Sequence, residues 1–290
     1  MRAPKFWDTD GVIPQMLEPL SWGYAAIGRL WSSMAEPYQP PIPVICVGNL
    51  VAGGAGKTPT VLAIVRFLAQ QGVAAHILSR GYGGRLKGPA QVNLDFHTAT
   101  DVGDEPLLHA AVAPSWIALN RVRGAQAAVA AGAQAIVMDD GFQNPGLVKD
   151  LSLLVIDSAY GFGNGRVHPA GPLRETPVDG LARADGVVVL QNSEPTVFLP
   201  DWDIPTFHAR SIPDDRALAL RGRRVLAFAG IGRPGRFFHT LQEIGADVAA
   251  QHDYSDHHNY REDEVWGLLE QAQKLDALAV TTTKDAVRLP

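Results

Sequence analysis

Gly53-Gly54-Ala55-Gly56-Lys57-Thr58 follows the apolar run Pro43-Val44-Ile45-Cys46-Val47 and precedes a helix-like segment at 60–71. The glycines let successive backbone N–H groups turn toward one anion, Lys57 can reach the β- and γ-phosphates, and the Thr58 hydroxyl can bind Mg²⁺. With Pro59, these residues form the predicted binding site for a nucleoside triphosphate. The first glycine of the usual pattern would fall at Val51, so a turn that only joins strand to helix is the alternative.

Strand and helix patterns alternate along the chain from residue 43 onward. Most of the expected strands are separated by Ala/Leu-rich helical stretches such as 60–71 and 121–131. This alternation predicts an α/β fold with a P-loop NTPase-like, mostly parallel sheet sandwiched by helices. The expected strands are 43–47, 74–78, 134–138, 153–157, 186–190, 224–229 and 277–282.

The proline-rich segment 191–221 interrupts this alternation, and we place a domain boundary within it. We expect an N-terminal amphipathic helix within 1–36, a nucleotide-binding core at 37–195, and a smaller C-terminal α/β lobe at 196–290 that closes the active-site cleft. The N-terminal helix is suggested by apolar residues at three- and four-residue steps along 13–34. It could dock on its own domain or lie in a lipid interface. The apolar positions are Ile13, Met16, Leu17, Leu20, Tyr24, Ile27, Trp31 and Met34.

The composition is typical of a soluble globular protein, with 290 residues of which 46% are hydrophobic and 19% charged. The net charge of −5 gives no basic field for nucleic acid, so we expect no such partner. One cysteine, Cys46, excludes an internal disulfide and a Cys-based zinc site, and favours the cytosol. No uninterrupted apolar stretch reaches the roughly 18 residues of a membrane span, and the N-terminus lacks a signal-peptide pattern.

A second apolar run, 135–138, ends in Asp139-Asp140. An aspartate at the carboxyl end of a strand can hold Mg²⁺ opposite the P-loop hydroxyl. Such a run in isolation is more often a strand that leads into a turn, but downstream of a P-loop the magnesium interpretation is favoured. We assign Thr58 and Asp139 as the metal ligands.

Eight ordered motifs, which span nearly the whole chain, together resemble the tetraacyldisaccharide 4′-kinase (lipid A 4′-kinase) family of Gram-negative bacteria. They are Gly48-Asn49-Leu50 with residues 53–59, Ser79-Arg80-Gly81-Tyr82-Gly83-Gly84, Gly103-Asp104-Glu105-Pro106, Asp139-Asp140-Gly141-Phe142-Gln143, Gly171-Pro172-Leu173-Arg174-Glu175, Gly230-Ile231-Gly232-Arg233-Pro234, Asp256-His257-His258-Asn259-Tyr260 and Thr282-Thr283-Lys284-Asp285-Ala286.

The resemblance implies a kinase that uses ATP and Mg²⁺ to phosphorylate the 4′-hydroxyl of a tetraacylated glucosamine disaccharide 1-phosphate. Its partner is then a lipid-anchored disaccharide, met by peripheral contact at the cytosolic face of the inner membrane. We expect a monomer. The chain departs from the family pattern at Val51, Asn144 and Thr283, and none of these departures removes a phosphate-binding or carboxylate group.

The resemblance also implies that Asp104 takes the proton of the acceptor hydroxyl. From the residues alone, an Asp-Glu pair before Pro106 is more often a helix start with Asp104 as its N-cap. His257 or His258 is implied to orient Asp104, and which of them does so stays open. The structural alternative is a polar loop in which His258 packs on Tyr260.

Arg174 and Asp140 are expected beside the phosphates, with Lys57 and Asp139. Arg80 and Tyr82 are expected near the sugar. The further residues expected at the substrate are Asn49, Gln143, Glu175 and Arg121.

Two other classes of protein fit parts of the sequence. A P-loop GTPase-like or ATPase switch, or a metal-delivery ATPase, would share the phosphate site. Thr283-Lys284-Asp285 lacks the spacer residue of the guanine-reading [NT]-K-x-D pattern, which favours adenine, and the chain has no Cys-rich tract for metal delivery. A membrane adaptor built on 13–34 would leave Lys57 and Asp139 unexplained.

Overall fold

The computed structural model describes residues 4–53, 56–191, 197 and 199–290. The chain divides into two compact units, Ala3–Ser211 and Ile212–Pro290, and each is described by itself.

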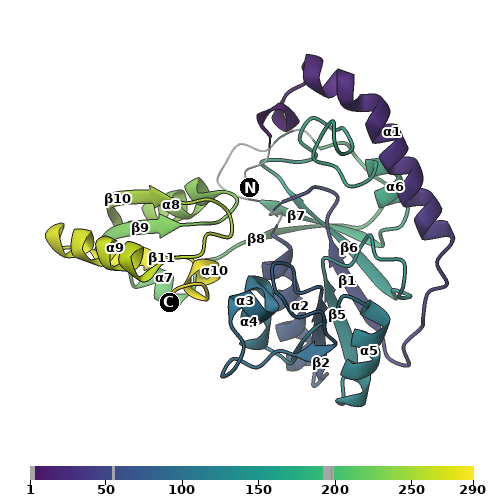
Figure 1. Ribbon diagram of the computed structural model, residues 1–290, viewed down its shortest axis with the longest axis horizontal. Helices are drawn as coiled ribbons and strands as arrows, with labels where there is room; N and C mark the ends of the chain where they lie inside the picture. The colour runs from purple at the N-terminus through teal and green to yellow at the C-terminus, as the bar shows by residue number, and fades with distance from the viewer. Residues whose placement is uncertain (1–3, 54–55, 192–196, 198) are drawn as a thin grey trace. The chain divides into compact units, whose positions relative to one another are not determined.

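The larger unit is built on an eight-stranded sheet in the order β3-β4-β2-β5-β1-β6-β7-β8 (Figure 1). All neighbouring strands run parallel except β3, which pairs antiparallel with β4. The predicted mostly parallel sheet is therefore confirmed. The strands are β1 Val44–Gly48, β2 Ala75–Ser79, β3 Ala90–Gln91, β4 Ser115–Ile117, β5 Ala135–Asp139, β6 Leu151–Asp157, β7 Gly186–Gln191 and β8 Thr206–Arg210.

Helices cover both faces of this sheet, because successive residues of a buried strand point to opposite sides. On one face, Val137 of β5 packs in a core with Val61 and Val65 of α2. On the other face, Ile136 packs in a core with Ala125 of α5. The helical segments of this unit are η1 Lys5–Asp8, α1 Val12–Ser33, α2 Lys57–Gln70, α3 Ala99–Val102, α4 Asp104–Ala110, α5 Arg121–Ala130 and α6 Pro177–Leu181.

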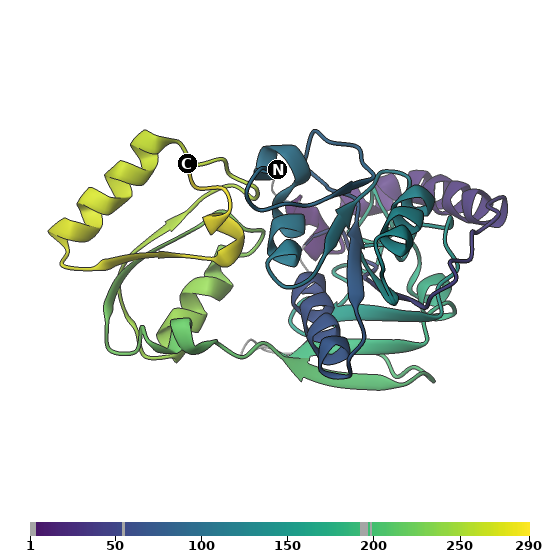
Figure 2. The same cartoon turned by 90° about the horizontal axis from the view of Figure 1, so that it is seen from below.

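The smaller unit has a three-stranded parallel sheet in the order β10-β9-β11, which Figure 2 shows from below. Phe238 and Leu241 of α8 pack in a core on one face, and Leu268 and Ala272 of α9 pack in a core on the other. The elements are α7 Asp215–Leu218, β9 Arg224–Ala229, α8 Pro234–Glu243, β10 Asp247–Asp253, α9 Glu262–Lys274, β11 Leu278–Thr281 and α10 Thr283–Ala286.

Four strands were not predicted from the sequence: β3, β4, β8 and β10. β3 and β4 have two and three residues, too few for a period-two pattern to emerge. β8 pairs with β7 and extends the large sheet, so the division between the two units falls at residues 211/212, later than the boundary expected at 195/196.

Helix α1 runs along one side of the larger unit, beside α6 (Figure 1), where Arg29 pairs with Asp179 at 3.6 Å. Its buried residues are the small Pro14 and Ser21. The Ser21 hydroxyl donates to the Val167 carbonyl at 2.7 Å. Small buried residues and ion pairs thus attach α1, while most of its large apolar side chains remain exposed.

Among the residues that the structure describes, no helix is long and apolar enough to cross a bilayer.

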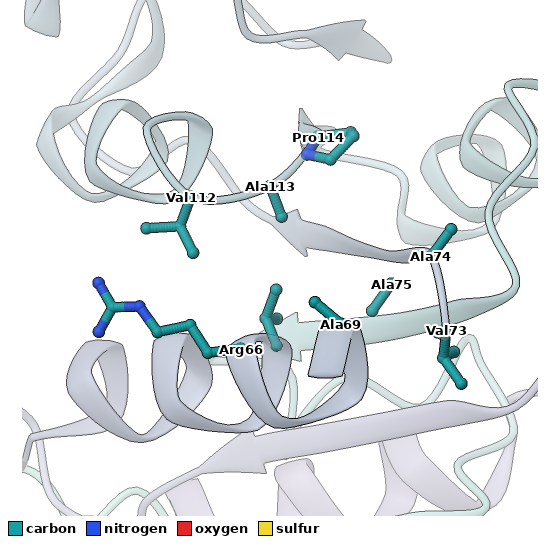
Figure 3. Close-up of a pocket in the computed structure, with 9 residues that line it drawn as sticks. Arg66, Ala69, Val73, Ala74, Ala75, Val112, Ala113 and Pro114 are labelled. Atoms are coloured by element: carbon teal, nitrogen blue, oxygen red, sulfur yellow. The ribbon is translucent and has the colours of Figure 1, made fainter. Parts of the chain in front are cut away.

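A shallow apolar groove lies between the C-terminal half of α2, the start of β2 and the loop before β4 (Figure 3). Arg66, Ala69, Val73 and Pro114 are among its lining residues. Because it opens where β2 begins, it lies at the amino edge of the sheet, away from the residues predicted to bind nucleotide.

Candidate active site

The phosphate loop leaves β1 at Gly48 and ends where α2 begins at Lys57. Gly56 is the N-cap with φ of 81°, in the left-handed region that favours glycine, and a Cβ there would also force the Leu190 side chain to shift. Because glycine offers no capping side chain, the first N–H groups of α2 can serve an anion. Thr58 lies in this first turn and Pro59 follows it. The expected contacts from Gly54 and Ala55 lie outside the described residues.

The start of the phosphate loop is paired with the segment 171–175. Ala52 N donates to Pro172 O at 2.8 Å, and Arg174 N donates to Leu50 O at 2.7 Å. This backbone pairing places Arg174 and Glu175 beside the loop.

Asp139 ends β5, next to β1 in the sheet, with Val47 and Asp139 in register. Its side chain is only 5% exposed, and its Oδ1 has no hydrogen-bond partner among the described residues. A buried carboxylate oxygen without a partner is costly unless a cation or donor meets it. Asp139 therefore fits a site for Mg²⁺, a cation that kinases hold through one or two carboxylates together with substrate phosphates.

Lys57 belongs to a network of polar and charged side chains. Its Nζ donates to Asn49 Oδ1 at 3.0 Å and lies 3.5 Å from Asp140 Oδ1. Arg174 binds the same carboxylate through two hydrogen bonds of 2.8 and 3.1 Å. The structure thus brings together Lys57, Asp140 and Arg174, which were all predicted to lie beside the phosphates.

The charge of Asp140 is stabilised by these two cations. Burial acts to raise the pKa of this carboxyl, but the charges and hydrogen bonds of Lys57 and Arg174 outweigh burial and lower it. Asp140 also has φ of 54°, in the left-handed region that non-glycine residues seldom adopt. The cations and this backbone strain mark the end of β5 as a constrained position.

Asn49, Gln143 and Glu175 continue the network. The Asn49 side chain is fully buried. Gln143 Nε2 donates to Asn49 O and to Glu175 Oε1, both at 2.9 Å. Arg183 pairs with Glu175, and its guanidinium lies 4.8 Å from the ring centroid of Phe142. Asn49 thus contacts Lys57, Gln143 contacts Arg174 at 3.3 Å, and Glu175 is joined to the network through Gln143. The sequence analysis expected all three residues at the substrate.

Asp104 is the first residue of α4 and is 5% exposed. Gly103 is the N-cap of this helix, so the alternative in which Asp104 is the N-cap is wrong. Gly103 has φ of 89°, and a Cβ on it would come within 2.2 Å of Tyr82 O. This close approach brings the loop of the exposed Tyr82 against the start of α4.

Arg80 and Arg121 follow β2 and β4, which are neighbours in the sheet. Arg121 is buried and donates to Ala118 O, whereas Arg80 is exposed. Burial, together with the nearby charge of Arg80, lowers the pKa of Arg121 to about 10. Two guanidinium groups that repel each other are suited to an anionic ligand.

In the smaller unit, His257 adopts φ of 59° and its N–H donates to Gly230 O at 3.0 Å. Buried groups fix this turn: Gly230 N donates to Asp285 Oδ1 at 2.9 Å, and Arg288 donates to both Gly230 O and His258 O. The strained backbone of His257 is thus held by a buried ion pair between Asp285 and Arg288.

His258 is engaged in packing. Its ring stacks on Tyr254 with centroids 4.6 Å apart and meets the edge of Tyr260 at 4.9 Å. Its Nε2 lies 3.1 Å from Glu264 Oε2. His258 thus packs on Tyr260, as the structural alternative expected. The Nε2 atom of His257 lies 3.5 Å from Lys284 Nζ.

The structure adds two residues that the sequence analysis missed. His109 of α4 is fully buried, with Nε2 3.1 Å from Asp139 Oδ2, and Arg183 pairs with Glu175. A lone polar residue in the apolar run Leu107-Leu108-His109-Ala110 was the available signal for His109. Arg183 follows a short helix among other charges and offers no comparable signal.

Comparison with known proteins decides the family. A family model described as tetraacyldisaccharide-1-P 4′-kinase matches residues 13–290. The chain belongs to this family. It is 54% identical to the tetraacyldisaccharide 4′-kinase of Rhodospirillum centenum, over all of this chain and 88% of that protein. It is 51% identical to the enzyme of the same name from Rhodospirillum rubrum, over all of this chain and 89% of that protein.

A solved structure shares the fold. It is the "apo" form of LpxK from Aquifex aeolicus in complex with ATP, and it matches with a TM-score of 0.76 and 29% identity over 96% of this chain and 90% of that chain. Family membership makes the chain a kinase with a hydroxyl acceptor in lipid A biosynthesis, and it removes the switch, metal-delivery and adaptor alternatives.

Proposed function

We propose that the chain transfers the γ-phosphoryl group of ATP to the 4′-hydroxyl of a tetraacylated glucosamine disaccharide 1-phosphate, through the residues assembled at the carboxyl ends of β1, β2, β4 and β5. The observation that carries this proposal is the pairing of β1 with β5, which sets Lys57 and the phosphate loop beside Asp139. Ligands of open α/β sheets bind at this edge.

The triphosphate is bound by the loop of residues 53–59 and by the N-terminus of α2. Lys57 would leave Asp140 to contact the β- and γ-phosphates, and Arg174 would bind the transferring group with its paired donors. Thr58 and Asp139 would hold Mg²⁺, which neutralises charge on the phosphate oxygens. Asn49, Gln143 and Glu175 would keep the two cations oriented.

The acceptor oxygen forms the new bond to the γ-phosphorus as the bond from phosphorus to the β–γ bridging oxygen breaks and ADP leaves. The proton of the 4′-hydroxyl passes to a carboxylate oxygen of Asp104. Of the two histidines we propose His257 for the catalytic role, because the ring of His258 packs on Tyr254 and its Nε2 lies 3.1 Å from Glu264 Oε2. Arg80, Tyr82 and Arg121 would bind the sugar and its anionic group.

Helix α1 supports action at a membrane surface. A tetraacylated acceptor stays in the bilayer, because each buried CH₂ is worth about 0.8 kcal/mol. The apolar side chains of Ile27, Leu30 and Trp31 are 60 to 71% exposed, far more than expected of a helix docked on its own core. We therefore assign the enzyme to peripheral contact with the cytosolic face of the inner membrane, and we expect it to act as a monomer.

The test is ATP-dependent phosphate transfer to a tetraacyl disaccharide 1-phosphate, with water and a simple alcohol as competing acceptors. We expect transfer to the 4′-hydroxyl, and a loss of most turnover in Lys57→Ala at saturating ATP and Mg²⁺. Lys274→Ala, which removes an exposed lysine of α9, is the matched control and should behave as the unaltered protein. Phosphate release to water alone, or full transfer by Lys57→Ala, would refute the proposal.

A further inference from the structure

His109 is a buried polar residue with one notable contact. It lies in α4, five residues after Asp104, and its side chain is fully buried. Its Nε2 is 3.1 Å from Asp139 Oδ2, although the N–H does not point along the line to the oxygen as a well-formed hydrogen bond requires. Its Nδ1 has no hydrogen-bond partner among the described residues.

A core-filling role does not account for this imidazole. An apolar side chain would fill the same space without burying two ring nitrogens, and a buried polar atom without a partner is destabilising. The nitrogen that does have a neighbour faces the carboxylate expected to bind Mg²⁺. The placement of the ring is therefore explained by Asp139.

The two oxygens of Asp139 have different surroundings. Oδ2 faces the imidazole, whereas Oδ1 is buried and has no partner among the described residues. A group that attracts Oδ2 restricts rotation of the carboxylate and leaves Oδ1 directed elsewhere. Partners of this kind fix the orientation of metal-binding side chains and raise the affinity of the site.

We propose that His109 is a positioning residue, which orients the carboxylate of Asp139 so that Oδ1 is presented to Mg²⁺. This inference rests on the proposed function, in which Asp139 binds the metal. It also links two parts of the reaction, because Asp104 and His109 share α4. A displacement of α4 would move the proton acceptor Asp104 together with His109, which orients Asp139.

Mn²⁺ provides a probe that does not depend on turnover. Its affinity is measured by the electron paramagnetic resonance signal of free Mn²⁺, with the full-length protein and a non-hydrolysable ATP analogue. We expect His109→Leu to weaken Mn²⁺ binding by roughly 10-fold, which is the size of effect seen when a residue that orients a metal ligand is removed. The affinity for the analogue without metal should stay unchanged.

His76→Leu is the matched control, because His76 is also a buried histidine of the larger unit but contacts Trp116 instead of the site. Unchanged Mn²⁺ affinity in His109→Leu, or an equal loss in His76→Leu, overturns the proposal. If His109→Leu does not fold, His109→Gln and His109→Met replace it. Gln can donate to Asp139 and must then bind Mn²⁺ more tightly than Met; equal affinities also overturn the proposal.

Asp139→Asn separates this inference from the proposed function. If Asp139→Asn leaves Mn²⁺ affinity unchanged, the assignment of Asp139 as a metal ligand fails and the inference fails with it. If Asp139→Asn weakens binding while His109→Leu does not, only the positioning role is refuted.

Discussion

The exposed apolar face of α1 gives a quantitative prediction for Trp31→Ser. Trp31 is 71% exposed. An aromatic side chain that buries 150–250 Å² at about 25 cal/mol per Å² would gain about 3–4 kcal/mol if its exposed part left water completely. A helix that lies in the headgroup region buries only part of that surface, so we take about half of this gain. The vesicle partition coefficient should therefore fall roughly 10-fold.

The assay is co-sedimentation of the protein with vesicles that contain anionic phospholipid, together with the KM for lipid acceptor and for ATP. Trp266→Ser is the control, because Trp266 is 65% exposed on α9 of the smaller unit. We expect Trp31→Ser to raise the KM for lipid and leave the KM for ATP unchanged. Equal partitioning of Trp31→Ser and the unaltered protein would refute the membrane role, and so would a loss of cooperative unfolding, which would mean that Trp31 supports the fold.

Asp104→Asn should lower turnover about 10²–10⁴-fold with unchanged nucleotide affinity, because a proton acceptor acts on the acceptor hydroxyl; normal turnover in this near-isosteric variant would exclude the role. His257→Ala should lower turnover and alter its pH profile, whereas His258→Ala should mainly lower the free energy of unfolding, by about 1 kcal/mol from lost ring contacts. Identical kinetic effects of these two variants would contradict the separate roles. The pKa of Asp140 is lowered from 3.8 in the folded state, so its negative charge stabilises the fold above pH 3.8. Asp140→Asn should therefore be less stable than the unaltered protein in that pH range. The difference in the free energy of unfolding should shrink as the pH falls below 3.8 and through the lowered pKa of the folded state. Urea unfolding at pH 7 and pH 3 tests this, and a gap of the same size at both pH values would argue against it.

The sequence was sufficient for the parts of the fold that repeat a strong pattern. Long apolar strands such as β5 and β6 appear as uninterrupted runs, because strands buried on both faces need no alternation. The glycine and lysine of the phosphate loop are local signals, since their roles depend on backbone conformation over a few residues. The predicted strands and the ends of α2 and α5 therefore agree with the structure within about three residues.

What the sequence could not supply are contacts between distant segments. β8 has five mostly exposed residues and is a strand because β7 pairs with it. Gln143 reaches Asn49 across 94 positions, and His109 meets Asp139 across a helix and a strand. The division into phosphate-binding and substrate-binding residues was made without knowledge of such contacts. Asn49, for example, was expected at the substrate, but it is fully buried and accepts a hydrogen bond from Lys57.

The backbone pairing between the phosphate loop and the segment 171–175 couples the two cations mechanically. Lys57 and Arg174 come from segments far apart in sequence, yet the bonds of Ala52 and Arg174 to Pro172 and Leu50 join their main chains. Any shift of the start of the loop would therefore carry Arg174 with it. An inserted or deleted residue in either segment would change the distance between the two cations. We therefore expect a change of length in one segment to be tolerated only when the other segment changes length as well.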